Sequence, residues 1–463
     1  MTSVTLNTTY KRQLADTLTP VSIYLRLRDK YQGCILLESS DYHGHDNSYS
    51  YICCQPIASF KVGGGVLDIA YPDKTTQRDN LTGAVIIEEF ERFRTSFKYR
   101  QQDFKFSTGG LFGYMAYDTV RYFEDLKLQH TNTDIPDICY QVYRYVIVVD
   151  HFKNEMYVFD HVSELAVDLD TLIGHIRRND NPQFNFTLQG DESASVSEAD
   201  FMEMVTNGIG HCQRGDVFQL VLSRRFAQAY QGDEFNVYRA LRSINPSPYL
   251  FYFDYGSFKL FGSSPESQIL IKGDKASIFP IAGTFRRTGN DQADAELAEK
   301  LSADEKENAE HIMLVDLARN DLSKSATQVE VEVLKEVQYY SHVLHLVSKV
   351  SGRLADSNAS MQLVADTFPA GTLSGAPKYK AMTLIDRYEP VSRNFYAGAI
   401  GLMDFNGDFN HAIMIRSFLS KDNTLHYQAG AGVVVKSDPK SELNEVNNKL
   451  AALRKAMQNA EEL

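Results

Sequence analysis

The irregular order of strand-like and helix-like segments in the second half of the chain most constrains its fold. Short apolar runs typical of strands mix with amphipathic helical patterns, and few of them form regular strand–helix–strand units. A doubly wound parallel sheet requires such units. The order of segments therefore favours an α+β or mixed α/β architecture.

Length and charge restrict the class of protein further. A chain of 463 residues exceeds the usual size of one hydrophobic core, so two domains or one large elaborated domain are expected. The net charge of −13 disfavours binding to a nucleic-acid backbone. There is no run of 18 apolar residues, no signal-peptide core and no CxxC pair among five sparse cysteines. We expect a cytoplasmic protein with reduced thiols that binds neither nucleic acid nor a membrane.

The first 190 residues are expected to be rich in strands. Alternating or compact apolar runs predict strands over residues 21–27, 34–39, 62–69, 142–149 and 155–159. The segment 181–198 is polar and lacks periodicity, so we place a domain boundary within it. This division predicts an N-terminal domain over residues 1–190 and a C-terminal domain over residues 191–463.

Three helices are expected in the second half. Ser197 and Ser302 each precede an acidic residue by three positions, which is typical of a capping box, and helical apolar spacing follows Ser197. The helix after Ser302 is expected over residues 303–318. A third helix is expected to start at Pro439, with Asp438 as its N-cap. Between the first two helices, residues 217–223 predict a buried strand.

Two of these helices carry glutamates three residues apart: Glu307 with Glu310, and Glu442 with Glu445. This spacing places both carboxylates of a pair on one helix face. Two such helices facing each other would supply the oxygen ligands that magnesium prefers. A solvated charged face is the alternative, because glutamate is common on exposed helices.

Single polar residues within apolar segments are further candidates. Arg416 stands in an apolar run that predicts a strand, where a charge must be paired or face a ligand. Glu266 follows a proline at a strand end, where a raised pKa would suit a general acid. His342 and His345 are three apart on a predicted strand and point to opposite faces, so a shared metal is disfavoured. Each histidine is then either a core residue or a general base.

Two loops are rich in glycine and small residues, at 368–378 and 428–432. Such loops let backbone N–H groups approach an anion such as a carboxylate. Neither has the spacing of a nucleotide phosphate-binding loop. A tight structural turn is the alternative reading of both.

Taken together, these segments resemble the family of chorismate-binding enzymes, and within it the large subunits of anthranilate synthases. The resemblance implies a fold of antiparallel β-sheets packed face to face with helices outside. The matching stretches occur in the family's order across nearly the whole chain and are LLESS (36–40), NPSPYLFYF (245–253), FGSSPES (261–267), PIAGTFRRTG (280–289), ENAEHIMLVDLARNDL (307–322), YSHVLHLVS (340–348), FPAGTLSGAPK (368–378), YAGAIG (396–401), AIMIRSF (412–418) and QAGAGVVVKSDPKSELNEVNNK (428–449).

The resemblance also implies roles for individual residues. Magnesium would be bound directly by Glu310 and Glu445, with Glu307 and Glu442 beside them. Glu266 would be the general acid, and His345 and Thr372 would act at the reacting face. Chorismate would be held by Gly283, Thr284, Tyr396, Arg416, Gly430, Ala431 and Gly432.

Two positions separate this chain from sister enzymes that it resembles. Gln219 stands where isochorismate- and salicylate-forming relatives carry a lysine base, so ammonia rather than water is the expected nucleophile. Ala282 stands where aminodeoxychorismate synthases carry a nucleophilic lysine. The resemblance therefore implies amination of chorismate with loss of pyruvate, a lyase reaction that gives anthranilate and begins tryptophan biosynthesis.

The remaining expectations concern partners and regulation. No cysteine has the GxCxGxQ-like setting of a glutamine amidotransferase, so ammonia must come from a separate amidotransferase subunit or from solution. The resemblance implies feedback inhibition by L-tryptophan, bound in part by the N-terminal domain at Ser39, Pro248, Tyr249 and Leu250. The alternatives are an aminodeoxychorismate synthase large subunit and a non-catalytic tryptophan sensor on the same fold. The intact glutamates and Arg416 argue against the sensor.

Overall fold

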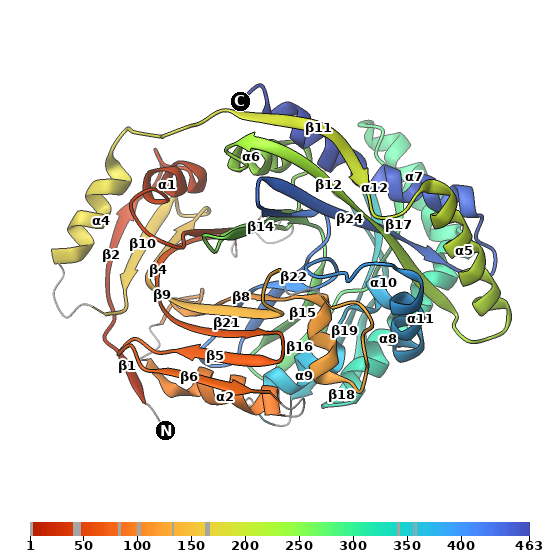
Figure 1. The fold of residues 1–463 in the computed structure, drawn as a ribbon, viewed down its shortest axis with the longest axis horizontal. Coiled ribbons are helices and arrows are strands. Elements are labelled where there is room, and N and C mark those ends of the chain that lie inside the picture. The colour runs from red at the N-terminus through yellow and green to blue at the C-terminus, as the bar shows by residue number, and fades with distance from the viewer. Residues whose placement is uncertain are drawn as a thin grey trace.

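Helices occupy the periphery of the molecule and strands fill its middle (Figure 1). The computed structural model describes residues 3–39, 48–81, 85–99, 103–131, 134–162, 167–339, 343–354, 356 and 359–463, with the backbone alone at residues 167, 168, 284 and 306. None of the helices in these ranges is long and apolar enough to cross a membrane.

The described strands are β1 (Val4–Leu6), β2 (Thr9–Leu14), β3 (Ile35–Ser39), β4 (Tyr49–Gly63), β5 (Val66–Ala70), β6 (Thr76–Asn80), β7 (Phe97–Tyr99), β8 (Gly110–Met115), β9 (Ile138–Asp150), β10 (Glu155–Asp160), β11 (Phe186–Ala194), β12 (Gln219–Gly232), β13 (Tyr249–Asp254), β14 (Phe258–Ser264), β15 (Ser267–Lys272), β16 (Lys275–Ile278), β17 (Ile281–Arg286), β18 (Ala326–Tyr339), β19 (Val343–Leu354), β20 (Gly375–Ala376), β21 (Ala399–Asp404), β22 (Phe409–Ile413), β23 (Ser417–Lys421) and β24 (Thr424–Val433). The described helices are α1 (Pro20–Leu27), α2 (Ile86–Ser96), η3 (Tyr117–Thr119), α3 (Val120–Phe123), α4 (Val167–Arg177), α5 (Glu198–Gln213), α6 (Phe235–Ile244), α7 (Asp291–Ala303), α8 (Glu305–Ser323), α9 (Ser360–Thr367), α10 (Gly371–Ser374), α11 (Lys378–Tyr388) and α12 (Pro439–Ala460).

The sheets are antiparallel, as expected. Apart from the parallel pair β1–β7, the strand pairings in the described part of the chain are antiparallel. Strands from both halves of the sequence pair with each other: β3 pairs with β13, and β8 pairs with β21. The sheets therefore continue across the proposed boundary near residue 190, and the division into two domains stays a prediction.

Apolar clusters lie between the sheets and under the outer helices. One cluster lies between strands and includes Ile35, Phe112, Val148, Phe251 and Ile400, all almost fully buried. A larger cluster lies beneath helices such as α12, whose predicted stripe is buried at Leu443, Val446, Leu450, Leu453 and Met457. Each such side chain contributes about 1.5–3 kcal/mol on burial, so packing of this stripe holds α12 against the sheet.

Local cap signals predicted two helices correctly. Ser197 accepts a hydrogen bond from the backbone N–H of Asp200 at the start of α5 (3.1 Å). Asp438 caps α12, and Pro439 occupies its first turn. The strands predicted over residues 142–149 and 155–159 are confirmed as parts of β9 and β10, which pair as a hairpin.

The strand predicted over residues 21–27 is wrong, because this segment is helix α1. The Thr19 side chain accepts a hydrogen bond from the backbone N–H of Ser22 (3.1 Å), and Pro20 begins the helix. Ile23, Tyr24 and Leu27 are buried, so packing and the N-terminal cap together override the alternating pattern.

Two further expectations need correction. The polar segment 181–198 contains the strand β11, which is mostly exposed and gains its stability from pairing with β12. Ser302 does not cap the predicted helix, because it lies near the end of α7. Asp304 is the N-cap of α8 and accepts a hydrogen bond from the backbone N–H of Glu307 (3.0 Å).

Candidate active site

The candidate site lies where two chain segments pass from one set of strands to another. Glu266 lies between β14 and β15, and Arg416 lies between β22 and β23. Because β14 pairs with β23 while β15 pairs with β22, the two crossings lie side by side. Backbone hydrogen bonds join them: the Ile413 N–H donates to the Glu266 carbonyl (2.9 Å), and the Ser263 N–H donates to the Arg416 carbonyl (3.1 Å).

Glu266 has the properties of a general acid. Its carboxylate Oε1 accepts a hydrogen bond from Thr372 Oγ1 (2.9 Å). Burial raises the pKa of Glu266 to about 7, although the Thr372 hydroxyl and the charges of Arg416 and Lys449 act to lower it. A carboxyl group with this pKa carries its proton in a large fraction of molecules at neutral pH.

Thr372 is fixed by the close approach of two helices. It stands in the single turn of α10, directly after Gly371. A Cβ added at Gly371 would lie 2.1 Å from Leu317 Cδ2 on α8, so a larger residue would have to displace the Leu317 side chain. The glycine-rich segment 368–378 therefore sets the position of the Thr372 hydroxyl relative to Glu266.

Arg416 breaks the strand that the sequence predicted for it. The residue adopts a left-handed conformation (φ +49°) between β22 and β23, which costs about 1–2 kcal/mol for a residue with a Cβ. Burial lowers the pKa of Arg416, while the charge of Glu266 acts to raise it. Arg416 is partly buried, and within the described residues its guanidinium has no recorded hydrogen bond. A carboxylate ligand would compensate such a partly buried charge.

The segment Gly430–Gly432 in β24 provides a tightly packed backbone surface. It pairs with β12, where Gly430 lies opposite Ser223. A Cβ added at Gly430 would lie 3.2 Å from the Tyr396 hydroxyl, and one at Gly432 would lie 2.6 Å from Gln219 Nε2. The predicted residues Gln219, Tyr396 and Gly430–Gly432, which include the buried Ala431, are therefore neighbours.

Gln219 and Tyr396 both lie buried beside this segment. Gln219 Oε1 is buried and has no hydrogen-bond partner among the described residues, which is unusual for a buried polar atom. Burial raises the pKa of the Tyr396 phenol, which keeps it protonated. Both groups can thus contribute hydrogen bonds to a ligand at Gly430–Gly432.

His345 is a neutral, oriented imidazole. Its Nδ1 donates a hydrogen bond to the carbonyl oxygen of Gly283 (2.8 Å), which leaves Nε2 as the basic nitrogen. Burial lowers the pKa of His345, and the nearby Arg416 charge lowers it further. Gly283 has φ +65°, and a Cβ there would lie 2.7 Å from Leu301, so glycine is required. The backbone of Thr284 pairs with His345, whereas the Thr284 side chain, like His342, lies outside the described residues.

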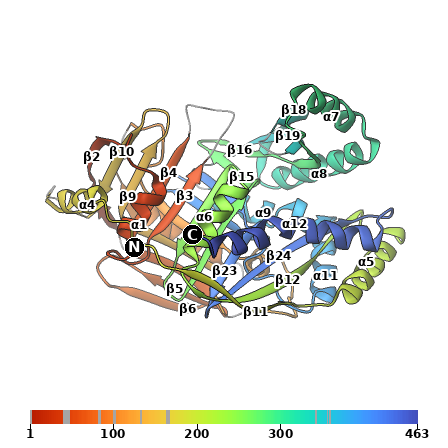
Figure 2. The same ribbon diagram turned by 90° about the horizontal axis from the view of Figure 1, so that it is seen from above.

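The four predicted magnesium ligands lie on α8 and α12. The helix α8 is at the end of the molecule away from α1 and α4, whereas α12 runs from the C-terminus beside α6 toward α5 (Figures 1 and 2). A Cβ at Gly283 would lie 3.2 Å from Glu307 Oε2, so this carboxylate is next to a predicted substrate-binding residue. Glu445 forms an ion pair with Lys449 (2.7 Å). Glu442 is buried, and Glu310 lies one helical turn after Glu307. Among the described residues, no three or more acidic, histidine or cysteine side chains are grouped to hold a metal.

The sequence reasoning missed Lys449, although it closes a matching stretch. Lys449 Nζ donates to the Gly430 carbonyl (2.9 Å) and also pairs with Glu445 four residues earlier. It therefore links α12 to the backbone segment of β24. The Glu–Lys spacing of four residues on a predicted helix was the available signal.

One cavity is lined by residues from both halves of the chain. It has a volume of about 560 Å³, and the predicted tryptophan-binding residues Ser39, Pro248, Tyr249 and Leu250 all line it. Ser39 in β3 pairs directly with Tyr249 in β13. The two segments thus form one wall, although Ser39 and Tyr249 are 210 positions apart in the sequence. Ser40 lies outside the described residues.

These features define the class of protein. Residues 10–455 match the sequence profile of the family described as chorismate binding enzyme, and the chain belongs to this family. It is 37% identical over 459 residues to anthranilate synthase component 1 of Thermus thermophilus, covering 97% of this chain and 98% of that protein. It is 35% identical over 483 residues to the component 1 of Aquifex aeolicus, covering 98% and 95%.

Solved structures agree with this assignment of the family. Anthranilate synthase component I from Streptococcus pneumoniae matches with a TM-score of 0.77 and 31% identity, over 96% of this chain and 99% of that one. The menaquinone-specific isochorismate synthase from Escherichia coli matches with a TM-score of 0.74 over 99% and 96% of the two chains. Its identity of 19% supports a common fold alone.

Proposed function

We propose that this chain is component 1 of an anthranilate synthase, which aminates chorismate and eliminates pyruvate to give anthranilate. One observation carries the proposal: Glu266, a carboxyl group with a pKa near 7, lies beside the partly buried guanidinium of Arg416. A proton donor and an anion receptor at one place suit a dianionic substrate with a poor hydroxide leaving group. The similarity to proteins named anthranilate synthase component 1 supports the same reading.

Substrate binding follows from the charges and the glycine backbone. Arg416 receives the enolpyruvyl carboxylate, with the backbone N–H groups of Gly430–Gly432 and the Tyr396 hydroxyl as neighbouring donors. Gly283 and Thr284 line the opposite side with His345. The rigid backbone contacts at these glycines hold the substrate without flexible side chains.

The first chemical step exchanges the ring hydroxyl for an amino group. Glu266 donates its proton to the departing hydroxyl, which leaves as water, while ammonia bonds to the ring carbon beside the one that bears the carboxylate. The Thr372 hydroxyl orients the Glu266 carboxyl group during this transfer. The product of this step is an aminated ring that still carries its enolpyruvyl ether.

The second step releases pyruvate and makes the ring aromatic. A base removes the proton from the carbon that carries nitrogen, and the ether C–O bond breaks. His345 Nε2 accepts or relays this proton, which the hydrogen bond from Nδ1 to the Gly283 carbonyl supports because it leaves Nε2 as the basic nitrogen. Aromatisation makes the step strongly downhill.

Magnesium is the proposed cofactor, held directly by Glu310 and Glu445 with Glu307 and Glu442 beside them. These ligands are all carboxylate oxygens, the type that magnesium prefers, and Glu307 is next to Gly283. When bound, the ion would hold the ring carboxylate and withdraw electron density from the ring.

The proposed partner is a glutamine amidotransferase subunit that supplies ammonia, because this chain has no cysteine in an amidotransferase setting. All five cysteines are buried free thiols, which fits a reducing compartment, and the cytoplasm is the proposed location. L-Tryptophan is the proposed feedback inhibitor, bound in the cavity that Ser39 and Tyr249 line.

The direct test supplies the purified chain with chorismate and magnesium, and with either ammonium or glutamine as the nitrogen source. We expect fluorescent anthranilate and one equivalent of pyruvate with ammonium, and no product with glutamine alone. A non-aromatic aminated product would identify an aminodeoxychorismate synthase instead. Absence of turnover, together with tryptophan binding, would identify a sensor.

A further inference from the structure

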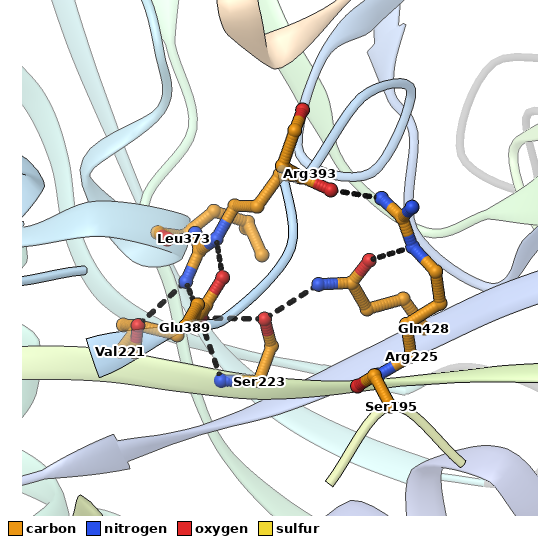
Figure 3. Close-up of polar contacts among 9 residues, drawn as sticks. Ser195, Val221, Ser223, Arg225, Leu373, Glu389, Arg393 and Gln428 are labelled. Carbon is orange, nitrogen blue, oxygen red and sulfur yellow. Dashed lines mark hydrogen bonds and ion pairs between the residues drawn. The ribbon is translucent and has the colours of Figure 1, made fainter. Parts of the chain in front are cut away.

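A buried ion pair lies directly behind the candidate site. Glu389 follows the end of α11, and Arg393 comes four residues later; both are at most 3% exposed. Arg393 Nε donates to Glu389 Oε2 (2.8 Å), and Arg393 Nη2 donates to Glu389 Oε1 (2.6 Å) (Figure 3). The guanidinium and the carboxylate thus meet in a two-point contact.

Arg393 uses its other hydrogens to hold two backbone carbonyls from separate elements. Nη1 donates to the Leu373 carbonyl in α10 (2.6 Å), and Nη2 donates to the Val221 carbonyl in β12 (2.7 Å) (Figure 3). Leu373 directly follows Thr372, and Val221 lies opposite Gly432 in the paired strands. The Arg393 side chain therefore binds the residue after Thr372 and the residue paired with Gly432.

Glu389 holds the same strand at a second point. Its Oε1 accepts hydrogen bonds from the backbone N–H (2.9 Å) and the hydroxyl (2.7 Å) of Ser223, which lies opposite Gly430. Gln428 Nε2 in turn donates to Ser223 Oγ (2.7 Å), and its Oε1 accepts from Arg225 Nε (3.2 Å) (Figure 3). The polar network thus continues along β12 and β24 beneath Gly430–Gly432.

Stability alone is a weak explanation for this pair. Taking both charges out of water costs several kcal/mol per ion, and well-packed apolar residues often replace such pairs without loss. Burial acts to lower the pKa of Arg393, but Glu389 more than compensates, so the guanidinium stays charged. An apolar replacement would lose the hydrogen bonds that join α10 and β12 through one side chain.

We infer that Glu389 and Arg393 form a positioning pair for the proposed reaction. The pair fixes α10, which carries the hydroxyl bound to Glu266, relative to the glycine segment of β24 that receives the substrate carboxylate. The inference rests on the proposed function. Neither residue touches the substrate, and the pair acts through Thr372 on one side and through Gly430–Gly432 on the other.

The test uses the effect of Thr372 on Glu266. The groups that shift the pKa of Glu266 are the Thr372 hydroxyl and the charges of Arg416 and Lys449. Glu266 and Thr372 line a small cavity together with Asp321, and the Asp321 carboxylate is paired with Lys378. Because the Thr372 hydrogen bond lowers the pKa of Glu266, losing that bond moves the alkaline limb of the kcat–pH profile to higher pH. A uniform loss of folded protein does not move this limb.

The variant R393K keeps the charge but cannot hold Glu389 and both carbonyls at once. We expect kcat to fall by about 100-fold, the change that a displacement of about 1 Å can produce, with a rise in KM. The alkaline limb should move to higher pH, as in T372V. In the double variant T372V/R393K, the second change should add no further shift of the limb.

Arg144 supplies a matched control, because it forms a similar two-point pair with the buried Asp160 in the β9–β10 hairpin (3.1 and 3.0 Å). R144K should leave the limb unchanged. E389Q changes the other member of the pair and keeps the shape of its side chain. It should move the alkaline limb of the kcat–pH profile in the same direction as R393K. It also replaces R393K if that variant does not fold.

A second measurement separates this inference from the proposed function. Infrared titration of the protonated carboxyl band, assigned with E266Q, reports the Glu266 pKa without turnover. R393K should raise that pKa even if the wild type makes no anthranilate, an outcome that would overturn the function alone. An unchanged Glu266 pKa in R393K and E389Q, or an equal further shift in the T372V background, would show that the pair does not act through Thr372.

Discussion

Burial gives the Glu266 carboxyl group a pKa of about 7, and a pH dependence follows from that value. Only the protonated form can act as an acid, so kcat should fall as the pH rises through about 7. E266Q cannot donate a proton and should lose about 100-fold or more in kcat, the usual scale of general acid catalysis. Steady-state kinetics between pH 6 and 9 would test this, and a flat profile for the wild type would rule Glu266 out as the acid.

Thermal unfolding of E266Q provides a control without turnover. The folded-state pKa of Glu266 is above its usual value of 4.5, so the folded state retains a proton that the unfolded state loses between about pH 4.5 and 7. Stability contributed by this group therefore decreases as the pH rises through that window. E266Q should raise the melting temperature relative to wild type more at pH 8 than at pH 5.

His345 should act mainly in the second step. H345M removes the basic Nε2 but keeps an apolar side chain of similar size, so amination by Glu266 can still proceed. We expect an aminated, non-aromatic intermediate to accumulate and pyruvate release to slow by about 100-fold. Chromatography of quenched reactions would detect it, and recovery of unreacted chorismate alone would refute the assignment.

Residue identities could be predicted where they match long motifs, but their geometry could not. The sequence singled out Arg416 as a charge in an apolar run, yet its left-handed backbone appears only because the chain changes sheets at that point. The requirement for Gly371 depends on Leu317, 54 positions away, and no local pattern contains that contact. The Glu445–Lys449 spacing was visible in the sequence, but the contact of Lys449 with the Gly430 carbonyl in another element was not.

At the level of elements, predictions succeeded where local signals decide the outcome. The helix α12 has a strong cap, a first-turn proline and a regular apolar stripe, and all three are local. The helix α1 was predicted as a strand because its 8 residues are too few for the apolar pattern to distinguish a helix from a strand. The strand β11 was missed because its stability comes from β12 rather than from burial.

The helices α8 and α12 carry the prediction about the metal. E310A and E445A each remove one proposed magnesium ligand, so turnover at saturating chorismate should fall by about 100-fold or more and the magnesium requirement should rise. D316A is the control on α8. The Asp316 carboxylate is exposed, and within the described residues its salt bridge is to Arg319 on the same helix. Circular dichroism would verify folding, and near-normal activity of E310A at low magnesium would exclude it as a ligand.

At the scale of the whole molecule, the two halves of the chain are joined by shared sheets. The pairings β3–β13 and β8–β21 mean that a shift of one half must be transmitted through hydrogen-bonded strands to the other. The large cavity lies against both β3 and β13. The β14 strand pairs with β13 and ends two residues before Glu266, so it connects this cavity to the proposed general acid. A ligand with different affinity for two arrangements of these strands could therefore change catalysis without entering the active site.

Tryptophan is the ligand proposed for this cavity, and Ser39 is the residue through which to test it. S39F places a large ring where the amino-acid head group would bind, so the inhibition constant for tryptophan should rise by at least about tenfold while kcat stays near wild type. S257F adds the same ring at an exposed turn after β13 and should leave inhibition unchanged. Because the chain contains no tryptophan, the fluorescence of the ligand reports binding directly. If inhibition is competitive with chorismate and S39F leaves its constant unchanged, tryptophan binds in the active site and the cavity has no part in regulation.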